Sequence, residues 1–119
     1  MGAPNRMVRV NELLKRELAE QLERESWNNM LVSVLDVATA PDLRSAIVLI
    51  SVFGGGPGAG HKVLAHLNAI RADLQKKVSS RVVLKYTPVF EFRIDDRLEA
   101  ADKVISLIEE MEQHDDGEN

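Results

Sequence analysis

The part of the chain that most constrains its fold is the stretch that follows Pro88. Its side chains alternate, with Phe90, Phe92 and Ile94 on one side and charged residues on the other, which is the period of a half-buried strand. The apolar face of such a strand needs a cover. Residues 62–78, just before it, carry apolar side chains at every third or fourth position, the spacing of an amphipathic helix. The sequence therefore predicts a helix packed on a strand as the core unit.

The size and composition fit a single domain. The chain has 119 residues and no cysteine, so disulfides and thiolate metal sites are excluded. No apolar run approaches the ~20 residues of a membrane span, and residues 1–10 lack the apolar core of a signal peptide. We expect a cytoplasmic protein with no membrane contact, no small-molecule substrate and no cofactor.

Four further elements are predicted by their apolar spacing. Residues 6–25 form an amphipathic helical pattern, and residues 30–38, rich in Val and Leu, predict a first strand. Residues 44–53 are apolar on both faces over their centre, as expected of a strand covered on both sides, and we place this strand in the middle of the sheet. A connection of four to six residues would join these two strands as a hairpin. Residues 98–111 predict a last amphipathic helix.

These elements define one α+β domain. We expect it to span residues 6–111, with a glycine-rich loop at residues 54–60 inside it. The remaining residues, 112–119, are polar and acidic, and this composition predicts a disordered tail.

The glycine-rich loop stands between a strand and a helix, a context in which backbone N–H groups can cradle phosphates. The phosphate-loop pattern is incomplete, however. His61 separates Gly60 from Lys62, and Val63 replaces the hydroxyl that would hold magnesium. Two interpretations stay open, a nucleotide site and a flexible linker, and the linker fits the spacing better.

Residue types that carry catalysis are present but do not form a set. His61, His66 and His114 are too scattered to bind a metal ion, and no serine lies in a nucleophile-elbow setting. A helix cap explains the pair Asp95 and Asp96. The sequence predicts no enzyme, no catalytic residue and no metal site.

Charge is segregated along the chain. The net charge is −4, but residues 96–119 hold nine acids against two bases, so residues 1–95 carry +3. No acid lies between Asp73 and Glu91. Bases in and beside this interval suit contacts with nucleic-acid phosphates, which position a partner without reading its sequence. The candidate RNA-binding residues are Lys62, Arg71, Lys76, Lys77, Arg81 and Lys85.

Three motifs, in order, resemble the ribosome-binding factor A family: RVNELLKRELAEQLERE at 9–25, DVATAPDLRSA at 36–46 and KYTPVFEF at 85–92. The resemblance implies a KH-like domain of the second type, with the order α-β-β-α-(α)-β-α and a three-stranded sheet carrying helices on one face. It also implies a bacterial factor that binds the 30S small ribosomal subunit and its 16S rRNA during late maturation. A role in processing the 5′ end of that RNA, and in growth in the cold, would follow.

The resemblance also points to a bend in the central helix. Members of the family bend this helix at Ala-x-Gly, and the corresponding position here is Ile70-Arg71-Ala72, which is the candidate helix-kink position although its residues differ. We expect the protein to act as a monomer. The alternative is a protein–protein interaction module with no RNA role.

Overall fold

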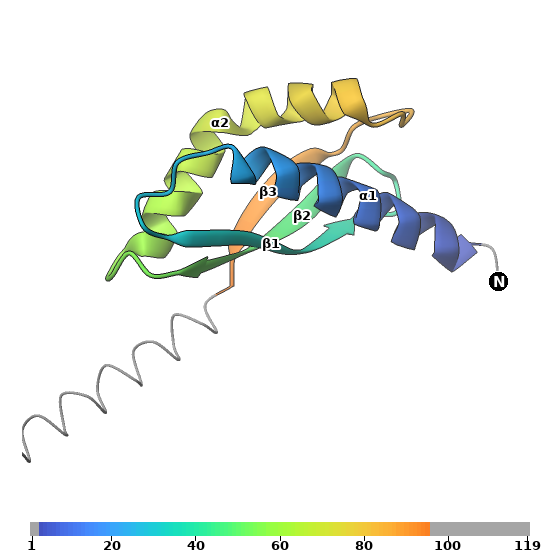
Figure 1. The fold of residues 1–119 in the computed structure, drawn as a ribbon. Helices are drawn as coiled ribbons and strands as arrows, with labels where there is room; N and C mark the ends of the chain where they lie inside the picture. Colours follow the sequence, from blue (N-terminus) through green and yellow to red (C-terminus); the bar gives the residue numbers. More distant parts are fainter. Residues whose placement is uncertain (1–2, 96–119) are drawn as a thin grey trace, which may run out of the picture.

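The computed structural model describes residues 3–95 (Figure 1). Its elements follow in the order α1 (Ala3–Glu23), β1 (Leu31–Thr39), β2 (Ser45–Phe53), α2 (Ala59–Arg81) and β3 (Val89–Ile94). This order confirms the predicted α+β fold. The helix predicted over 98–111 and the tail predicted over 112–119 lie outside the described residues.

The three strands form one sheet in the order β1-β2-β3, which confirms the central place of the second strand. β1 and β2 are antiparallel and joined by five residues, 40–44, so the predicted hairpin is present. β2 and β3 are parallel, from Ser45 opposite Val89 to Ile50 opposite Ile94. Such a parallel pair needs a crossover connection, and α2 provides it.

Both helices cover the same face of the sheet, so the domain has two layers (Figure 1). α1 packs over β1 and α2 packs over β3. The core is formed by the helical stripes predicted above and by alternate strand residues. Its most deeply buried members are Leu14, Leu18, Leu22, Val37, Val48, Ile50, Val63, Leu67, Leu74, Val78 and Phe90.

The opposite face of β2 differs from the prediction. Within residues 3–95 no helix covers it, and Ile47 and Leu49 are half-buried rather than enclosed. Each lies between side chains of the two neighbouring strands, as Leu49 does between Asp36 and Arg93. Cross-strand neighbours of this kind shield part of an apolar side chain on an open face. The prediction that the central strand is covered on both sides was therefore wrong within residues 3–95.

The glycine-rich loop is a turn between β2 and α2. Gly54, Gly55, Gly56 and Gly58 all have φ between 73° and 85°, a conformation that other residues adopt only with strain. Gly55 also lies against the Met30 side chain, where an added Cβ would come within 2.5 Å of Cγ. Backbone geometry and this close contact account for these glycines without a ligand.

α2 is one continuous helix over Ala59–Arg81 and includes the candidate kink position Ile70–Ala72. Figure 1 shows its axis changing direction between the first, green half and the second, yellow half. The change of direction lets one helix follow the curved surface of the sheet. Assignment of the bend to Ile70, Arg71 and Ala72 remains a prediction.

Candidate nucleic-acid interface

The outer face of α2 presents small and basic side chains. Val63, Leu67, Leu74 and Val78 turn α2 toward the sheet, so residues half a turn away face solvent. Exposed residues on this outer side include Lys62, Ala65, Ala69, Ala72 and Lys76. The small alanine side chains let a partner approach the helix backbone closely. The two lysines lie at either end of the row of alanines and offer positive charge to that partner. The side of α2 away from the core is thus suited to a polyanion.

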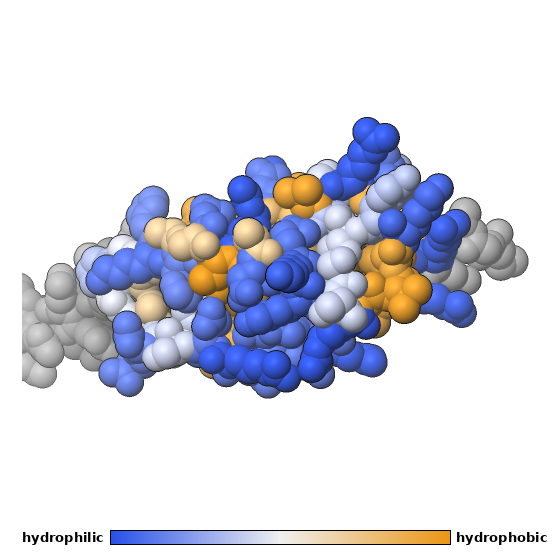
Figure 2. Space-filling model, turned by 90° about the horizontal axis from the view of Figure 1, so that it is seen from above, coloured by the Kyte–Doolittle hydropathy of each residue, from blue (hydrophilic) through white to orange (hydrophobic). Residues whose placement is uncertain are grey.

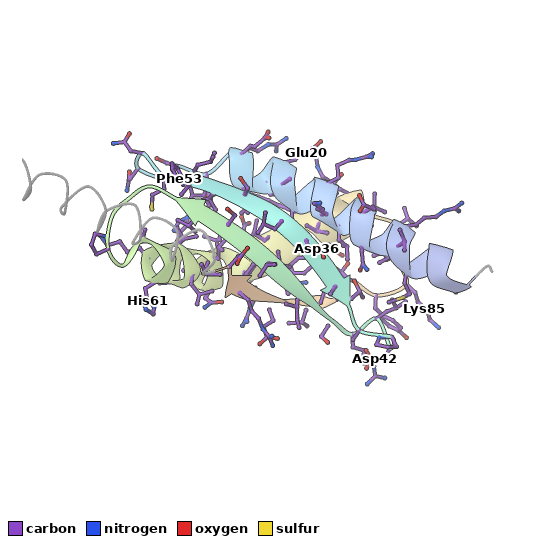
Figure 3. All side chains as sticks on the ribbon, turned by 90° about the horizontal axis from the view of Figure 1, so that it is seen from below. Glu20, Asp36, Asp42, Phe53, His61 and Lys85 are labelled. Carbon is purple, nitrogen blue, oxygen red and sulfur yellow. The ribbon has the colours of Figure 1, made fainter. Side chains whose placement is uncertain are left out.

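The six predicted bases, which we call the cationic ridge, are all exposed. They do not form a pocket but follow α2 and the loop after it. A helix of 23 residues is about 35 Å long, and Figure 3 shows His61 and Lys85 at opposite ends of the molecule. These bases extend from Lys62, next to His61, to Lys85, but they do not share one side of α2. Lys62 and Lys76 lie on its outer side, whereas Arg81 turns toward α1. The members of the cationic ridge are Lys62, Arg71, Lys76, Lys77, Arg81 and Lys85.

Arg81 is engaged with acids of α1. Its Nη1 donates a hydrogen bond to Oε2 of Glu20 at 3.2 Å and lies 3.7 Å from Oε2 of Glu17. Within the described residues that Glu17 oxygen is buried and accepts no hydrogen bond, so the guanidinium supplies its nearby positive charge. Arg81 therefore links α1 to α2, and its charge is partly compensated inside the molecule.

Lys77 is also paired, with Asp73 one turn earlier on α2 at 2.8 Å. Both side chains are more than half exposed. An exposed pair of this kind contributes only ~0.2–1 kcal/mol, and a phosphate can replace the carboxylate at little cost. The Asp73 carboxylate partly compensates the charge of Lys77 but leaves the lysine accessible to a phosphate.

One end of the domain carries residues that the sequence did not single out. The loop 82–88 and the hairpin connection 40–44 lie together there, because the Val89 N–H donates to the Arg44 carbonyl oxygen at 2.9 Å. Tyr86 in this loop is 58 % exposed, and the Lys85 Nζ lies 5.6 Å from its ring centre. The adjacency of Tyr86 and Lys85 was visible in the sequence. The sequence showed neither the exposure of Tyr86 nor the contact between Arg44 and Val89.

His66, exposed on α2, contacts the turn after α1. Its ring meets Trp27 edge-on with centroids 5.2 Å apart, and its Nε2 lies 3.6 Å from Oε1 of Glu25. The Trp27 Nε1 donates to the Leu22 carbonyl oxygen at 2.9 Å. These contacts fix the turn against α2.

Among residues 3–95, the His, Asp and Glu side chains nowhere gather in a group of three that could hold a metal ion. No helix in this same part of the chain has the length and apolar character needed to cross a membrane.

Figure 2, which looks down on the helical side, shows a mostly hydrophilic surface with separate hydrophobic patches. The helical side is therefore a mostly polar surface.

A three-stranded sheet with helices on one face, in the order α-β-β-α-β, defines a KH-like domain of the second type. Residues 6–108 match the family described as Ribosome-binding factor A. The chain belongs to this family, which is one of ribosome-binding factors.

Relatives support the assignment over most of the chain. The ribosome-binding factor A of Opitutus terrae is 35 % identical over 109 residues, which cover 91 % of this chain and 88 % of the relative. The factor of Akkermansia muciniphila is 33 % identical over 110 residues, covering 92 % and 86 %.

Solved structures show the same fold. The crystal structure of ribosome-binding factor A from Thermus thermophilus matches with a TM-score of 0.64 at 25 % identity, over 74 % of this chain and 93 % of that one. A homology model of the Thermus thermophilus factor, fitted into a cryo-electron-microscopy map of a 30S–RbfA complex, matches with a TM-score of 0.58 at 26 % identity. It covers 70 % of this chain and 88 % of its own.

Proposed function

We propose that this protein binds the free 30S subunit and its 16S rRNA in the cytoplasm during late subunit maturation. Binding there would assist processing of the 16S rRNA 5′ end and growth in the cold. The observation that carries the proposal is membership of the ribosome-binding factor A family, together with the fit of a related fold into a 30S–RbfA complex. The protein acts as a binding factor and not as an enzyme.

The cationic ridge supplies the physical basis for RNA binding. Lysine and arginine contacts to phosphates hold and orient a nucleic acid without reading its sequence. If three or four of the six bases engage, the affinity falls with salt along a log–log slope of roughly −2 to −3. The bases are spread along α2 and do not enclose a pocket. Such an arrangement can meet successive phosphates on the surface of a folded RNA.

Aromatic content argues for structured RNA as the main target. The chain has three Phe, one Tyr and one Trp, and Phe90 and Phe92 are buried in the core. Proteins that hold long single strands need several exposed aromatic platforms. A folded subunit, recognised mainly by its shape and phosphates, fits this surface better.

Co-sedimentation tests the proposal. The full chain is mixed with free small subunits or with assembled ribosomes and centrifuged at moderate salt. We expect it to pellet with free small subunits and to remain in the supernatant with assembled ribosomes. Equal recovery with both, or with neither, would contradict a role in subunit maturation.

A protein-interaction module remains the second candidate, and one feature favours it. Leu31 and Phe53 are opposite each other on the open face of the sheet and are 65 % and 52 % exposed. An exposed apolar pair on a face that no helix of the described residues covers is a typical protein contact. Charge reversal at Lys76, Lys77, Arg81 and Lys85 separates the two functions, because a module that reads protein through the open face keeps its partner.

We also propose the domain limits and the state of the protein in solution. The domain extends over residues 6–111, residues 112–119 form a tail outside it, and the protein acts as a monomer. Sedimentation equilibrium of the full chain and of a chain ending at residue 111 tests this. Equal thermal stability and a monomer mass for both are expected.

A further inference from the structure

The end of the domain that carries loop 82–88 combines an exposed aromatic ring with positive charge. We propose that Tyr86 stacks on an unpaired nucleotide of the ribosomal RNA, whose phosphates are met by Lys85 and Arg44. This inference rests on the proposed function and adds a base contact to the phosphate contacts of the ridge.

The five aromatic residues differ in how much of each side chain is exposed to a partner. Phe90 and Phe92 are buried, and Trp27 is half-buried with its ring against His66. Of the described aromatics, Tyr86 and Phe53 are the two with more than half of their surface exposed. A base needs an open ring face of this kind for stacking.

Charge distinguishes Tyr86 from Phe53. The Lys85 Nζ is 5.6 Å from the centre of the Tyr86 ring, within the range of a cation–π contact, and Arg81 lies five residues earlier at the end of α2. Phe53 instead faces Leu31 across the β1–β2 pair. A nucleotide is an aromatic base joined to an anionic phosphate, so the Tyr86 end matches both of its parts.

Two segments of the chain meet at this end. The Val89 N–H bonds to the Arg44 carbonyl oxygen at 2.9 Å and so holds the hairpin connection beside the loop that carries Tyr86. Figure 3 shows Asp42 of that connection and Lys85 at the same end of the molecule. The Asp42 Oδ1 accepts a hydrogen bond from the Arg44 N–H at 3.0 Å, which fixes the turn that presents Arg44.

The loop itself is built to expose its side chains. Leu84 packs against the core and Pro88 is buried, which anchors the loop at two points. Val83, between the buried Val82 and the partly buried Leu84, is fully exposed. The buried residues thus hold the loop in place while Tyr86 stays open to a partner.

Matched variants test the inference through affinity for salt-washed 30S subunits. Tyr86→Leu removes the aromatic ring and is expected to weaken binding by roughly 5- to 100-fold. Tyr86→Phe retains the ring and should bind like the wild type. Val8→Ala truncates an exposed apolar side chain of α1 that belongs to neither candidate surface and should have no effect. Thermal unfolding of each variant shows whether the fold is kept.

The salt dependence separates stacking from charge. Tyr86→Leu should keep the wild-type log–log slope, whereas Lys85→Ala should make it shallower by about 0.7 to 0.9. Wild-type affinity of Tyr86→Leu, or equal losses in Tyr86→Phe and Tyr86→Leu, would overturn the stacking proposal while leaving the proposed function intact.

Two further outcomes are decisive. A loss seen with whole subunits but not with protein-free 16S rRNA would mean that Tyr86 contacts a ribosomal protein, which also overturns the proposal. Failure of the wild type itself to bind subunits would overturn the proposed function, and the inference with it.

Discussion

Gln75 of α2 brackets the start of β3 by two hydrogen bonds around Phe90. Its Oε1 accepts from the Phe90 N–H at 2.6 Å, and its Nε2 donates to the Pro88 carbonyl oxygen at 2.9 Å. Within residues 3–95 β3 is an edge strand, so in this part of the chain no neighbouring strand pairs with these backbone groups on their outer side. The Gln75 side chain therefore satisfies two backbone groups that a further strand would otherwise pair. It also fixes the loop end of β3 against α2.

Replacement of Gln75 by alanine should lower the free energy of unfolding by about 1–3 kcal/mol, since it leaves partly buried backbone groups unsatisfied. Urea denaturation measures this change. Asn68→Ala is the matched control, because it also removes an amide from α2 at an exposed position. Equal effects of the two substitutions would show that the two Gln75 hydrogen bonds contribute nothing to the free energy of unfolding.

The ion pairs of Arg81 lead to a second prediction. Glu17 and Glu20 compete with RNA phosphates for this guanidinium. Glu17→Gln/Glu20→Gln should therefore tighten binding to 30S subunits by roughly two- to fivefold, the range expected from release of a partly exposed ion pair. Fluorescence anisotropy of a labelled chain against subunits at low salt measures the affinity.

The control for this experiment must carry the same change in net charge. Glu12→Gln/Glu23→Gln alters two exposed acids of the same helix and should tighten binding less, because in the structure neither acid is within ion-pair distance of Arg81. If both double variants bind equally well, general charge explains the gain, and Arg81 is not a phosphate contact.

The contact between Gly55 and Met30 gives a third prediction. Gly56→Ala adds a Cβ with no atom within 4 Å, so its cost is the strain of a positive φ, about 1–2 kcal/mol. Gly55→Ala carries the same strain and also collides with Met30, so it should cost more. In a Met30→Ala background the difference between the two glycine variants should shrink, leaving only the part that comes from the 3.1 Å approach to the Ala59 Cβ. Persistence of the full difference would place the conflict elsewhere.

Local patterns predicted the elements of the fold well. The strand predicted at 44–53 is found at Ser45–Phe53, and the helix predicted at 62–78 extends to Ala59–Arg81. The alternation that predicted one apolar side of β3 was correct, since Phe90 and Phe92 are buried. These features depend on the chemistry of neighbouring residues, which a sequence displays directly.

Contacts between distant residues were beyond the reach of these patterns. Arg81 meets Glu20 across 61 positions, and charge spacing along the chain gives no sign of it. The same holds for the face beside Leu49, which no helix of residues 3–95 covers, since apolar character on both faces does not say which elements cover a strand. The candidate ridge was recognised from composition, whereas the internal acids that partly neutralise it required the fold.

The central claim is that a line of bases along α2 grips ribosomal RNA through its phosphates. The most direct test is the affinity for 30S subunits as a function of salt, compared between the wild type, Lys62→Ala/Lys76→Ala, and the charge-matched control Arg24→Ala/Arg93→Ala. We predict a wild-type log–log slope of roughly −2 to −3, a slope shallower by about 1.5 for the ridge variant, and an unchanged slope for the control. The same slope for all three proteins would contradict the account.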